Sequence, residues 1–239
     1  MLVGIAAALS ACAPSKEMPK VLKIGYTHYA PMAYFDEQAG ELTGFDVELA
    51  RKACAELGYQ PEFVEIIWDN KVRDLENGTI DCIWNGMTIT QELETEILVS
   101  NPYLENRQVA VLPSASVNDF TSVYAMESVA MEKGGAAQAM LSQGGMPVSV
   151  MREGATQMAA LALVGVDADC AVVDYVMAKH LVGKGVYDHL AFVEIGAPAE
   201  YFGVGFRKED AELCNLLNGL IATYQADGTL DGLRVKYLG

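Results

Sequence analysis

The strongest constraint on the fold is a regular alternation of strand-like and helix-like segments. An apolar run over 21–26 predicts a strand, and apolar residues over 47–57 recur at the spacing of one helix face until Gly58. Further segments are predicted as strands at 61–67 and 80–84 and as a short helix at 71–77. Such alternation favours βαβ units and a largely parallel sheet.

The same pattern returns in the second half of the chain. Helical spacing over 153–164 ends at Gly165, and the apolar strand 169–174 ends in a polar residue, as does the earlier strand over 81–85. Two similar α/β lobes are therefore expected. Two final helices are predicted at 209–224 and 229–238.

The polar residues at the strand ends mark the place for a site. In open parallel sheets, ligands bind beyond the carboxyl ends of the strands. We therefore expect a site at residues 85–88 and at Asp174, in a cleft between the two lobes.

Composition and charge narrow the function classes. The 239 residues are 51% hydrophobic and 20% charged, so the chain can bury a substantial core. Acidic residues number 32 against 16 basic ones, and the net charge is −16. A surface of this sign repels phosphate backbones and anionic lipid headgroups, which disfavours binding to nucleic acid or electrostatic docking on membranes.

The N-terminus has the character of a targeting segment. Residues 2–11 are apolar or small, a length that suits a signal-peptide core but not a bilayer span. The sequence Leu9-Ser10-Ala11-Cys12 resembles a bacterial lipobox, in which Cys12 is acylated and anchors the protein to the membrane. The Lys or Arg that usually starts such a signal is absent, and the alternative is a frayed apolar N-terminus.

The other four cysteines are predicted to be free core thiols. They are too few and too widely spaced for a disulfide framework, and the chain contains no C-x-x-C pair. The four are Cys54, Cys82, Cys170 and Cys214.

Eight short motifs occur in a characteristic order. They are LKIG (22–25), YAPMAY (29–34), LTGFDV (42–47), GTID (78–81), GMTIT (86–90), SNPY (100–103), DCAVVD (169–174) and ADGT (226–229). Each is weak alone, but in this order and spacing they resemble the extracellular solute-binding proteins of polar amino acid ABC importers. The resemblance covers the chain from about residue 21 to 239.

The resemblance implies an α/β fold with two lobes, a hinge and a central ligand cleft, the type II periplasmic-binding-protein fold. Strands would cross between the lobes near 105–109 and 197–202. The expected divisions are 1–12 for the lipoprotein signal and acylated Cys12, 13–20 for a tether, 21–106 for the first part of lobe 1, 107–198 for lobe 2 and 199–239 for the second part of lobe 1.

The resemblance also implies a function. We expect a monomeric substrate-binding lipoprotein that captures an amino acid or related amine-bearing solute and delivers it to an ABC permease and its ATPase. It would lie outside the cytoplasm, either lipid-anchored to the cell membrane or periplasmic. We expect no cofactor, no metal and no nucleic-acid partner.

Several residues match the family's ligand contacts. Asp174 matches the aspartate that takes the ligand ammonium, and Tyr29 and Trp68 match the aromatic positions that sandwich the ligand. A strand-end carboxylate and ordinary aromatic packing are the alternatives. The loop that offers hydrogen bonds to the ligand, or simply caps a strand, is matched by Asn85, Gly86 and Thr88.

The carboxylate-binding part of the family pattern is altered. Leu93 stands where the family has the arginine that clasps the ligand carboxylate. The glycine–threonine turn of lobe 2 appears as KGGA over 133–136, which includes Gly134 but lacks a hydroxyl. Glu132 stands where the family often has a neutral or basic residue.

Three explanations for this change remain open. The ligand is an amine held by Glu132 and Asp174; or another cation, Lys133 or Arg107, replaces the arginine; or backbone N–H groups over 134–137 bind the carboxylate at a helix N-terminus. We place a cationic or amine-bearing solute first. Loss of a set of charge-assisted hydrogen bonds would otherwise weaken binding of an ordinary amino acid by orders of magnitude.

The chain has one more candidate cleft residue, His28, and its expected fold allows two other functions. His28 precedes Tyr29 at the cleft edge and is a candidate ligand contact or pH sensor, with a solvated loop histidine as the alternative. A dehydratase of the same fold would need cations for two substrate carboxylates, which Leu93 argues against. A ligand-sensing domain shares the fold but is expected beside transmembrane segments, for which the sequence offers no sufficiently long apolar run.

Overall fold

The computed structural model describes residues 20–239. The predicted signal, the acylated Cys12 and all of the tether except Lys20 lie outside the described residues. Within the described part, no helix combines the length and the apolar character needed to cross a membrane.

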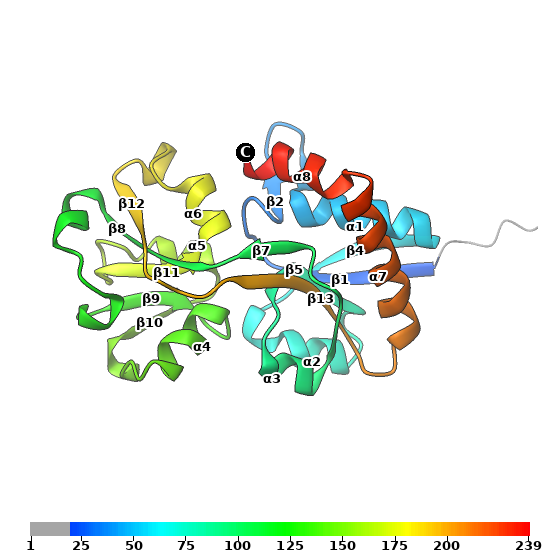
Figure 1. Ribbon diagram of the computed structural model, residues 1–239, viewed down its shortest axis with the longest axis horizontal. Coiled ribbons are helices and arrows are strands. Elements are labelled where there is room, and N and C mark those ends of the chain that lie inside the picture. The colour runs from blue at the N-terminus through cyan, green and yellow to red at the C-terminus, as the bar shows by residue number, and fades with distance from the viewer. Residues whose placement is uncertain (1–19) are drawn as a thin grey trace, which may run out of the picture.

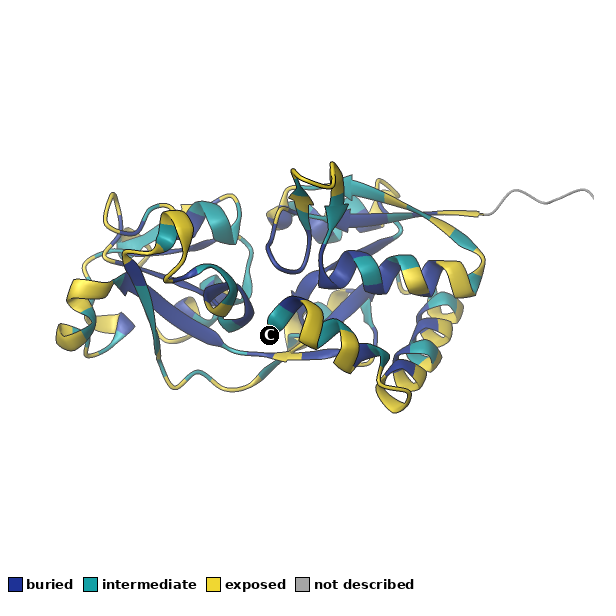
Figure 2. Cartoon of the chain, turned by 90° about the horizontal axis from the view of Figure 1, so that it is seen from above, coloured by how far each residue is buried: buried dark blue, intermediate teal, exposed yellow. Residues whose placement is uncertain are grey.

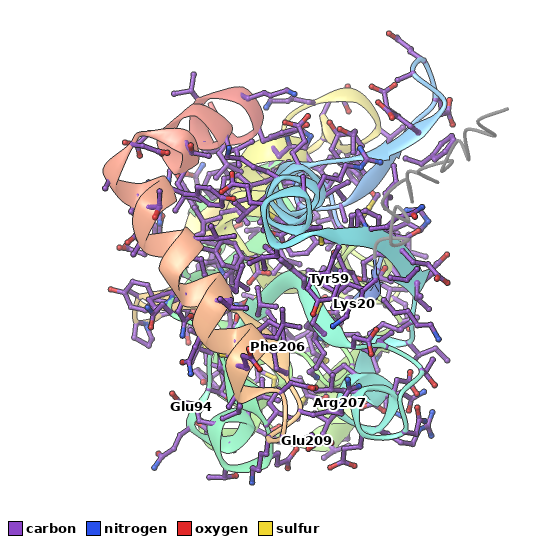
Figure 3. The ribbon with its side chains drawn as sticks, turned by 90° about the vertical axis from the view of Figure 1, so that its right-hand side faces the viewer. Lys20, Tyr59, Glu94, Phe206, Arg207 and Glu209 are labelled. Carbon is purple, nitrogen blue, oxygen red and sulfur yellow. The ribbon has the colours of Figure 1, made fainter. Side chains whose placement is uncertain are left out.

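One sheet of six strands forms the part that we call lobe 1 (Figure 1). Its strands are β1 (Lys20–Tyr26), β4 (Tyr59–Glu65), β5 (Cys82–Thr88), β6 (Leu98–Val99), β7 (Leu104–Asn106) and β13 (Glu200–Phe206). Their order is β4-β1-β5-β13-β6, with β7 paired to β13. The parallel register of β1 and β4 begins with Lys20 opposite Tyr59, and Figure 3 shows these two side chains together. A two-stranded hairpin, β2 (Tyr34–Asp36) with β3 (Glu41–Thr43), lies apart from this sheet.

A second sheet of five strands forms lobe 2. Its strands are β8 (Gln108–Pro113), β9 (Val129–Glu132), β10 (Met151–Gly154), β11 (Cys170–Asp174) and β12 (Leu190–Glu194), in the order β10-β9-β11-β8-β12. Because β7 ends at Asn106 and β8 begins at Gln108, Arg107 links the lobes once, and residues 195–199 link them again (Figure 2).

Both sheets are mixed, whereas the sequence pattern predicted a largely parallel sheet. In lobe 1, β1 runs parallel to β4 and β5, but β13 runs antiparallel to β5, β6 and β7. In lobe 2, β9 runs parallel to β10 and β11, but β8 runs antiparallel to β11 and β12. The antiparallel strands β8 and β13 are those that enter a lobe from the other lobe, so no crossover helix fixes their direction.

Helices cover both faces of each sheet (Figure 1). In lobe 1, α1 (Phe45–Leu57), α7 (Ala211–Ala226) and α8 (Thr229–Leu238) lie on one side, and α2 (Lys71–Glu76) and α3 (Gln91–Glu96) lie on the other. In lobe 2, α5 (Gln157–Leu161) and α6 (Tyr175–Leu181) lie opposite α4 (Ala136–Gln143). Short 3-10 turns complete the described chain: η1 (Trp68–Asn70), η2 (Ser114–Asp119), η3 (Val123–Ala125), η4 (Val148–Val150) and η5 (Gly185–Tyr187).

The predicted helix over 153–164 was only partly right. Residues up to Gly154 belong to β10, and α5 begins after Thr156, whose hydroxyl accepts the N–H of Ala159 at 3.0 Å. Gly154 also lies tightly against α5, because a Cβ there would come within 2.5 Å of the Ala160 nitrogen. The two final predicted helices are confirmed by α7 and α8.

Alternating apolar residues build the core on both faces of each sheet. In β8, Val109 and Val111 join the cluster beneath α5 and α6, whereas Ala110 and Leu112 join the cluster that includes Leu141 of α4. Figure 2 shows buried residues concentrated along the strands of both lobes. All four cysteines of the described part are buried free thiols, as predicted.

Candidate ligand-binding cleft

A cavity of about 380 Å³ lies between residues of the two lobes. This volume suits a small solute. The lobe 1 lining comprises Thr27, Tyr29, Trp68, Lys71, Asn85, Gly86, Met87, Thr88, Thr90, Glu92 and Leu93. The lobe 2 lining comprises Gln108, Glu132, Gly134, Gly135, Ala136, Ala137, Ala139, Ser142, Gln143, Gln157 and Asp174.

The structure brings together all of the predicted ligand-contact residues except His28. Tyr29, Trp68, Asn85, Gly86 and Thr88 line the cavity from lobe 1, and Glu132, Gly134 and Asp174 line it from lobe 2. His28 is not part of the lining: its side chain is 46% exposed, with Nε2 3.8 Å from Glu65.

Asp174 ends β11 and is held by four neutral donors. The Tyr29 hydroxyl donates to Oδ2 at 2.6 Å across the cleft, and Gln157 Nε2 donates to the same oxygen. Asn106 Nδ2 and Gln108 Nε2 donate to Oδ1 at 2.6 and 2.7 Å. Burial raises the pKa of Asp174, and these four hydrogen bonds act against that rise.

Glu132 ends β9 and is only 6% exposed. Burial, and then the charge of Asp174, raise the pKa of Glu132 to about 8. The charge of Lys71 and a backbone hydrogen bond from Gln157 act in the opposite direction. The cavity therefore holds two buried carboxyl groups from lobe 2, and Asp174 has far more side-chain donors than Glu132.

Lys71, which was not among the residues predicted from the sequence, contributes a buried cation from lobe 1. It is 8% exposed, and its Nζ lies 4.9 Å from the centre of the Trp68 ring. The ammonium donates to the carbonyl of Gly134 at 2.8 Å, across the cleft, and to the carbonyl of Trp68 at 3.4 Å. Burial lowers the pKa of Lys71, and the charge of Glu132 raises it. The sequence contained one signal for this residue, because Lys71 lies three positions after Trp68, one turn along the same face.

A β-bulge shapes the lobe 1 wall. The pairing of β5 with β13 shifts between Gly203 and Gly205, and Gly86 in the shifted stretch has a φ of +59°. The Gly86 N–H donates to Asp46 Oδ2 at 2.6 Å, and burial raises the pKa of Asp46 to about 7. The residues expected to follow the strand therefore lie within β5, which continues to Thr88.

A further amide on this wall is only partly hydrogen-bonded. Asn85 Nδ2 donates to Thr27 Oγ1 at 2.8 Å. Among the described residues, the buried Asn85 Oδ1 has no hydrogen-bond partner.

The two substitute cations considered from the sequence do not line the cavity. Arg107 Nε donates to Glu194 at 2.8 Å, and its guanidinium lies 3.6 Å from the centre of the Tyr175 ring. Lys133 Nζ lies 3.3 Å from Asp69 at the edge of the cleft. Leu93, by contrast, does line the cavity, where it places apolar surface.

At the turn that opens α4, two of the four backbone N–H groups over 134–137 already donate to other groups. The N–H of Gly134 donates to Gln138 Oε1 at 2.8 Å, and the N–H of Gly135 donates to the carbonyl of Glu132 at 3.2 Å. The next two residues, Ala136 and Ala137, line the cavity.

Several contacts join the lobes directly. They include Tyr29 to Asp174, Lys71 to the Gly134 carbonyl and Lys133 to Asp69. The structure is therefore a closed arrangement in which ligand-sized space is enclosed by side chains of both lobes.

Comparison with known proteins agrees with this architecture. The family model described as bacterial extracellular solute-binding proteins, family 3, matches residues 22–239. The L-arginine-binding protein of Pseudomonas aeruginosa is 30% identical over 99% of this chain and 95% of that protein. The histidine-binding periplasmic protein of Salmonella typhimurium is 29% identical over 95% of this chain and 91% of that protein.

Solved structures show the same two-lobed fold. An ABC uptake transporter substrate-binding protein of Streptococcus pneumoniae with bound histidine has a TM-score of 0.84, with 27% identity and 92% coverage of both chains. An ancestral amino acid-binding protein, a precursor of cyclohexadienyl dehydratase, has a TM-score of 0.82 and 28% identity, covering 92% of this chain and 96% of that chain. Because the family model spans nearly the whole described region, this chain belongs to the bacterial extracellular solute-binding proteins, family 3.

Proposed function

We propose that this protein captures an amino acid or a related small amine-bearing solute between its lobes and delivers it to an ABC permease with its ATPase. The observation that carries the proposal is the closed cavity of about 380 Å³, lined by the buried Glu132 and Asp174 and by Lys71. Carboxyl groups of this kind suit a ligand ammonium, and apolar walls exclude water. The relatives named for arginine and histidine binding support the same class of ligand.

The mechanism follows from the division of the lining between two lobes. A ligand that contacts Trp68 in lobe 1 and Glu132 in lobe 2 makes its full set of contacts only when the lobes are closed. Ligand binding therefore shifts the population from open to closed forms. The closed form would be the one that the permease receives.

Anchoring at Cys12 is part of this proposal. Cleavage before Cys12 and acylation of its thiol would keep the protein at the cell membrane, on the extracytoplasmic side. Metabolic labelling with a fatty acid checks this. We expect label on the wild-type protein and none on Cys12→Ala, whereas equal labelling of both would contradict the anchor.

Binding is favoured over dehydratase-like catalysis by the charges in the cavity. A substrate with two carboxylates would need at least two cations, and the lining residues, all in the described part of the chain, include one, Lys71. The lining also adds acidic groups, Glu132 and Asp174, that would repel such a substrate.

Calorimetric titration of the purified, ligand-stripped protein tests the function. The panel is the common L-amino acids, L-cystine and their decarboxylated amines. We expect at least one to bind with a Kd in the micromolar range or below, and small-angle scattering to report a more compact protein on binding. No binding across the panel, or binding without compaction, would count against capture between the lobes.

A further inference from the structure

Lys71 has the features of a ligand-binding cation rather than of a surface lysine. Among the lining residues, all within 20–239, it is the one Lys, Arg or His side chain. Leu93, which stands where the family pattern has an arginine, lines the same cavity. Lys71 therefore gives the cavity wall a cation that position 93 does not provide. A lysine is rarely buried to 8% exposure without a partner that needs its charge.

The hydrogen bonds of Lys71 leave capacity for a ligand. An ammonium has three N–H donors, and two carbonyl acceptors surround this one, those of Gly134 at 2.8 Å and Trp68 at 3.4 Å. Among the described residues, no carboxylate oxygen lies within 4.0 Å of Lys71 Nζ. One donor is therefore available, and Glu132, the carboxyl group whose charge acts most strongly on Lys71, is not in direct contact with it.

Glu132 complements Lys71 from the opposite lobe. Both side chains line the same cavity, both are less than 9% exposed, and their charges influence each other. Asp174 differs, because Tyr29, Gln157, Asn106 and Gln108 already donate to its two oxygens. Asp174 is therefore committed to positioning side chains of the cleft, and Glu132 is the carboxyl group with open acceptor capacity.

We propose that Lys71 and Glu132 hold the zwitterionic head group of an α-amino acid between them, with the lysine ammonium bound to the ligand carboxylate and the glutamate bound to the ligand ammonium. This inference rests on the proposed function and narrows it, because a ligand without a carboxylate would leave Lys71 unused. It also gives the cleft a carboxylate-binding residue that neither Lys133 nor Arg107 provides.

The competing role for Lys71 is internal. In that case its ammonium serves only to compensate Glu132 and to latch lobe 1 to the Gly134 carbonyl. The two roles differ in what happens when the charge is removed. An internal cation competes with a ligand ammonium, so its removal would tighten binding of amines and amino acids alike.

Calorimetry on matched ligands separates these roles. The probes are the panel amino acid that binds best to the wild-type protein, its decarboxylated amine and its carboxyl methyl ester; for L-arginine these are agmatine and arginine methyl ester. Wild-type protein should bind the amine and the ester about 10- to 100-fold more weakly than the amino acid, the range for one charge-assisted hydrogen bond. Equal affinities would overturn the role of Lys71 without needing any variant.

Variants then assign the residues. Lys71→Met should lose about 10- to 100-fold in amino acid affinity while amine affinity stays constant or rises, since a like charge has gone. Glu132→Gln should weaken the amino acid and the amine by similar factors, because both carry the ammonium. Thermal unfolding of each variant checks that it folds.

Each remaining outcome has a defined meaning. If Lys71→Met weakens both ligands equally, or tightens both, Lys71 acts on the cleft and not on the carboxylate, and the proposal is wrong. If Glu132→Gln leaves both unchanged, the ammonium is held elsewhere and the pair is likewise refuted. If wild-type protein binds no member of the panel, the proposed function itself fails, a result distinct from tight binding without Lys71 dependence.

Discussion

At the scale of single residues, ionisation of Glu132 opposes folding at neutral pH. Burial moves the pKa of Glu132 from 4.5 to about 8 in the folded protein. Between these values the folded state keeps a proton that the unfolded state has lost, so this residue's contribution to stability falls as pH rises from 4.5 to 8. Asp46, with a pKa raised to about 7, changes stability in the same direction.

The Glu132→Gln variant measures how much the ionisation of Glu132 lowers the stability of the folded protein. Glutamine does not ionise, so the variant should match wild type at pH 5 and exceed it at pH 8.5. Because opening of the lobes rehydrates Glu132, we expect only about 1–2 kcal/mol, or roughly 2–8 °C in Tm. Ligand-free thermal melts at the two pH values measure this difference.

Glu194→Gln provides a control of opposite sign. A hydrogen bond from Arg107 lowers the pKa of Glu194, so its removal should not stabilise the protein at pH 8.5. A Glu132→Gln variant that is no more stable than wild type at pH 8.5 would show that Glu132 remains hydrated in the ligand-free protein.

The sequence pattern predicted cavity residues at or near strand ends, but it missed Lys71, a lobe 1 residue that contacts lobe 2. Asp174 was predictable because a polar residue that ends a buried strand has few structural reasons to be there, and Asn85 because it interrupts an apolar strand, although that strand continues to Thr88. Lys71 was missed because a lysine at the start of a short helix is ordinarily solvated. Its ammonium donates to the carbonyl of Gly134 in lobe 2, a residue distant in sequence.

At the scale of elements, the bulge in β5 brings the chain close to Tyr29. Gly86 has a positive φ, and a Cβ there would lie 2.6 Å from Tyr29 Cε1. Bulges of this kind re-aim side chains near functional sites. The Tyr29 ring that packs on Gly86 also carries the hydroxyl bound to Asp174, so this wall and the cross-lobe contact are coupled.

Gly86→Ala should therefore damage both stability and binding. The left-handed backbone costs about 1 kcal/mol for alanine, and displacement of Tyr29 adds to it, for a total of about 2–4 kcal/mol. Denaturant unfolding measures the first effect, and calorimetry with the best-binding panel ligand measures the second, for which we expect at least a tenfold loss.

Gly78→Ala is the matched comparison. Gly78 also has a positive φ, of 77°, but a Cβ there would meet nothing within 4 Å. It should carry the backbone cost alone and leave ligand affinity unchanged. If the two variants behave alike in both measurements, the Tyr29 contact has no part in the cleft.

Element boundaries were predicted where local signals agreed with tertiary packing. The helix predicted over 47–57 is α1, which the sequence ends with Gly58 in the left-handed conformation. The helix predicted over 153–164 failed at its start because Glu153 and Gly154 pair in β10 with β9, and that pairing joins segments distant in sequence. Periodicity alone does not detect the close packing of Gly154 on α5.

At the scale of the whole molecule, the two-lobed organisation was predictable and the strand directions were not. Repetition of the strand–helix pattern indicated two lobes, and the family motifs indicated that chain ends share one lobe. The antiparallel direction of β8 and β13 depends on passage of the chain between lobes, which no local pattern encodes.

Closure of the molecule also involves charges at the rim of the cleft. Lys133 on lobe 2 lies 3.3 Å from Asp69 on lobe 1, and their side chains are 52% and 40% exposed. An exposed pair contributes about 0–1 kcal/mol and is screened by salt. It forms only when the lobes are closed, so its energy biases the open–closed equilibrium directly.

Lys133→Ala should weaken binding of the best panel ligand by at most about fivefold at low salt, and the difference should vanish in about 0.5 M NaCl. Removal of any lysine also makes this acidic protein more attractive to a cationic ligand, so the comparison needs a variant with the same charge change. Lys52→Ala provides it, because Lys52 pairs with Glu56 at 3.0 Å within α1 and does not cross the cleft. At low salt, calorimetry should show weaker ligand binding by Lys133→Ala than by wild type and Lys52→Ala. At high salt, the three proteins should bind the ligand equally well. If the two variants bind alike at low salt, the rim pair does not bias closure, and contacts inside the cavity must determine it.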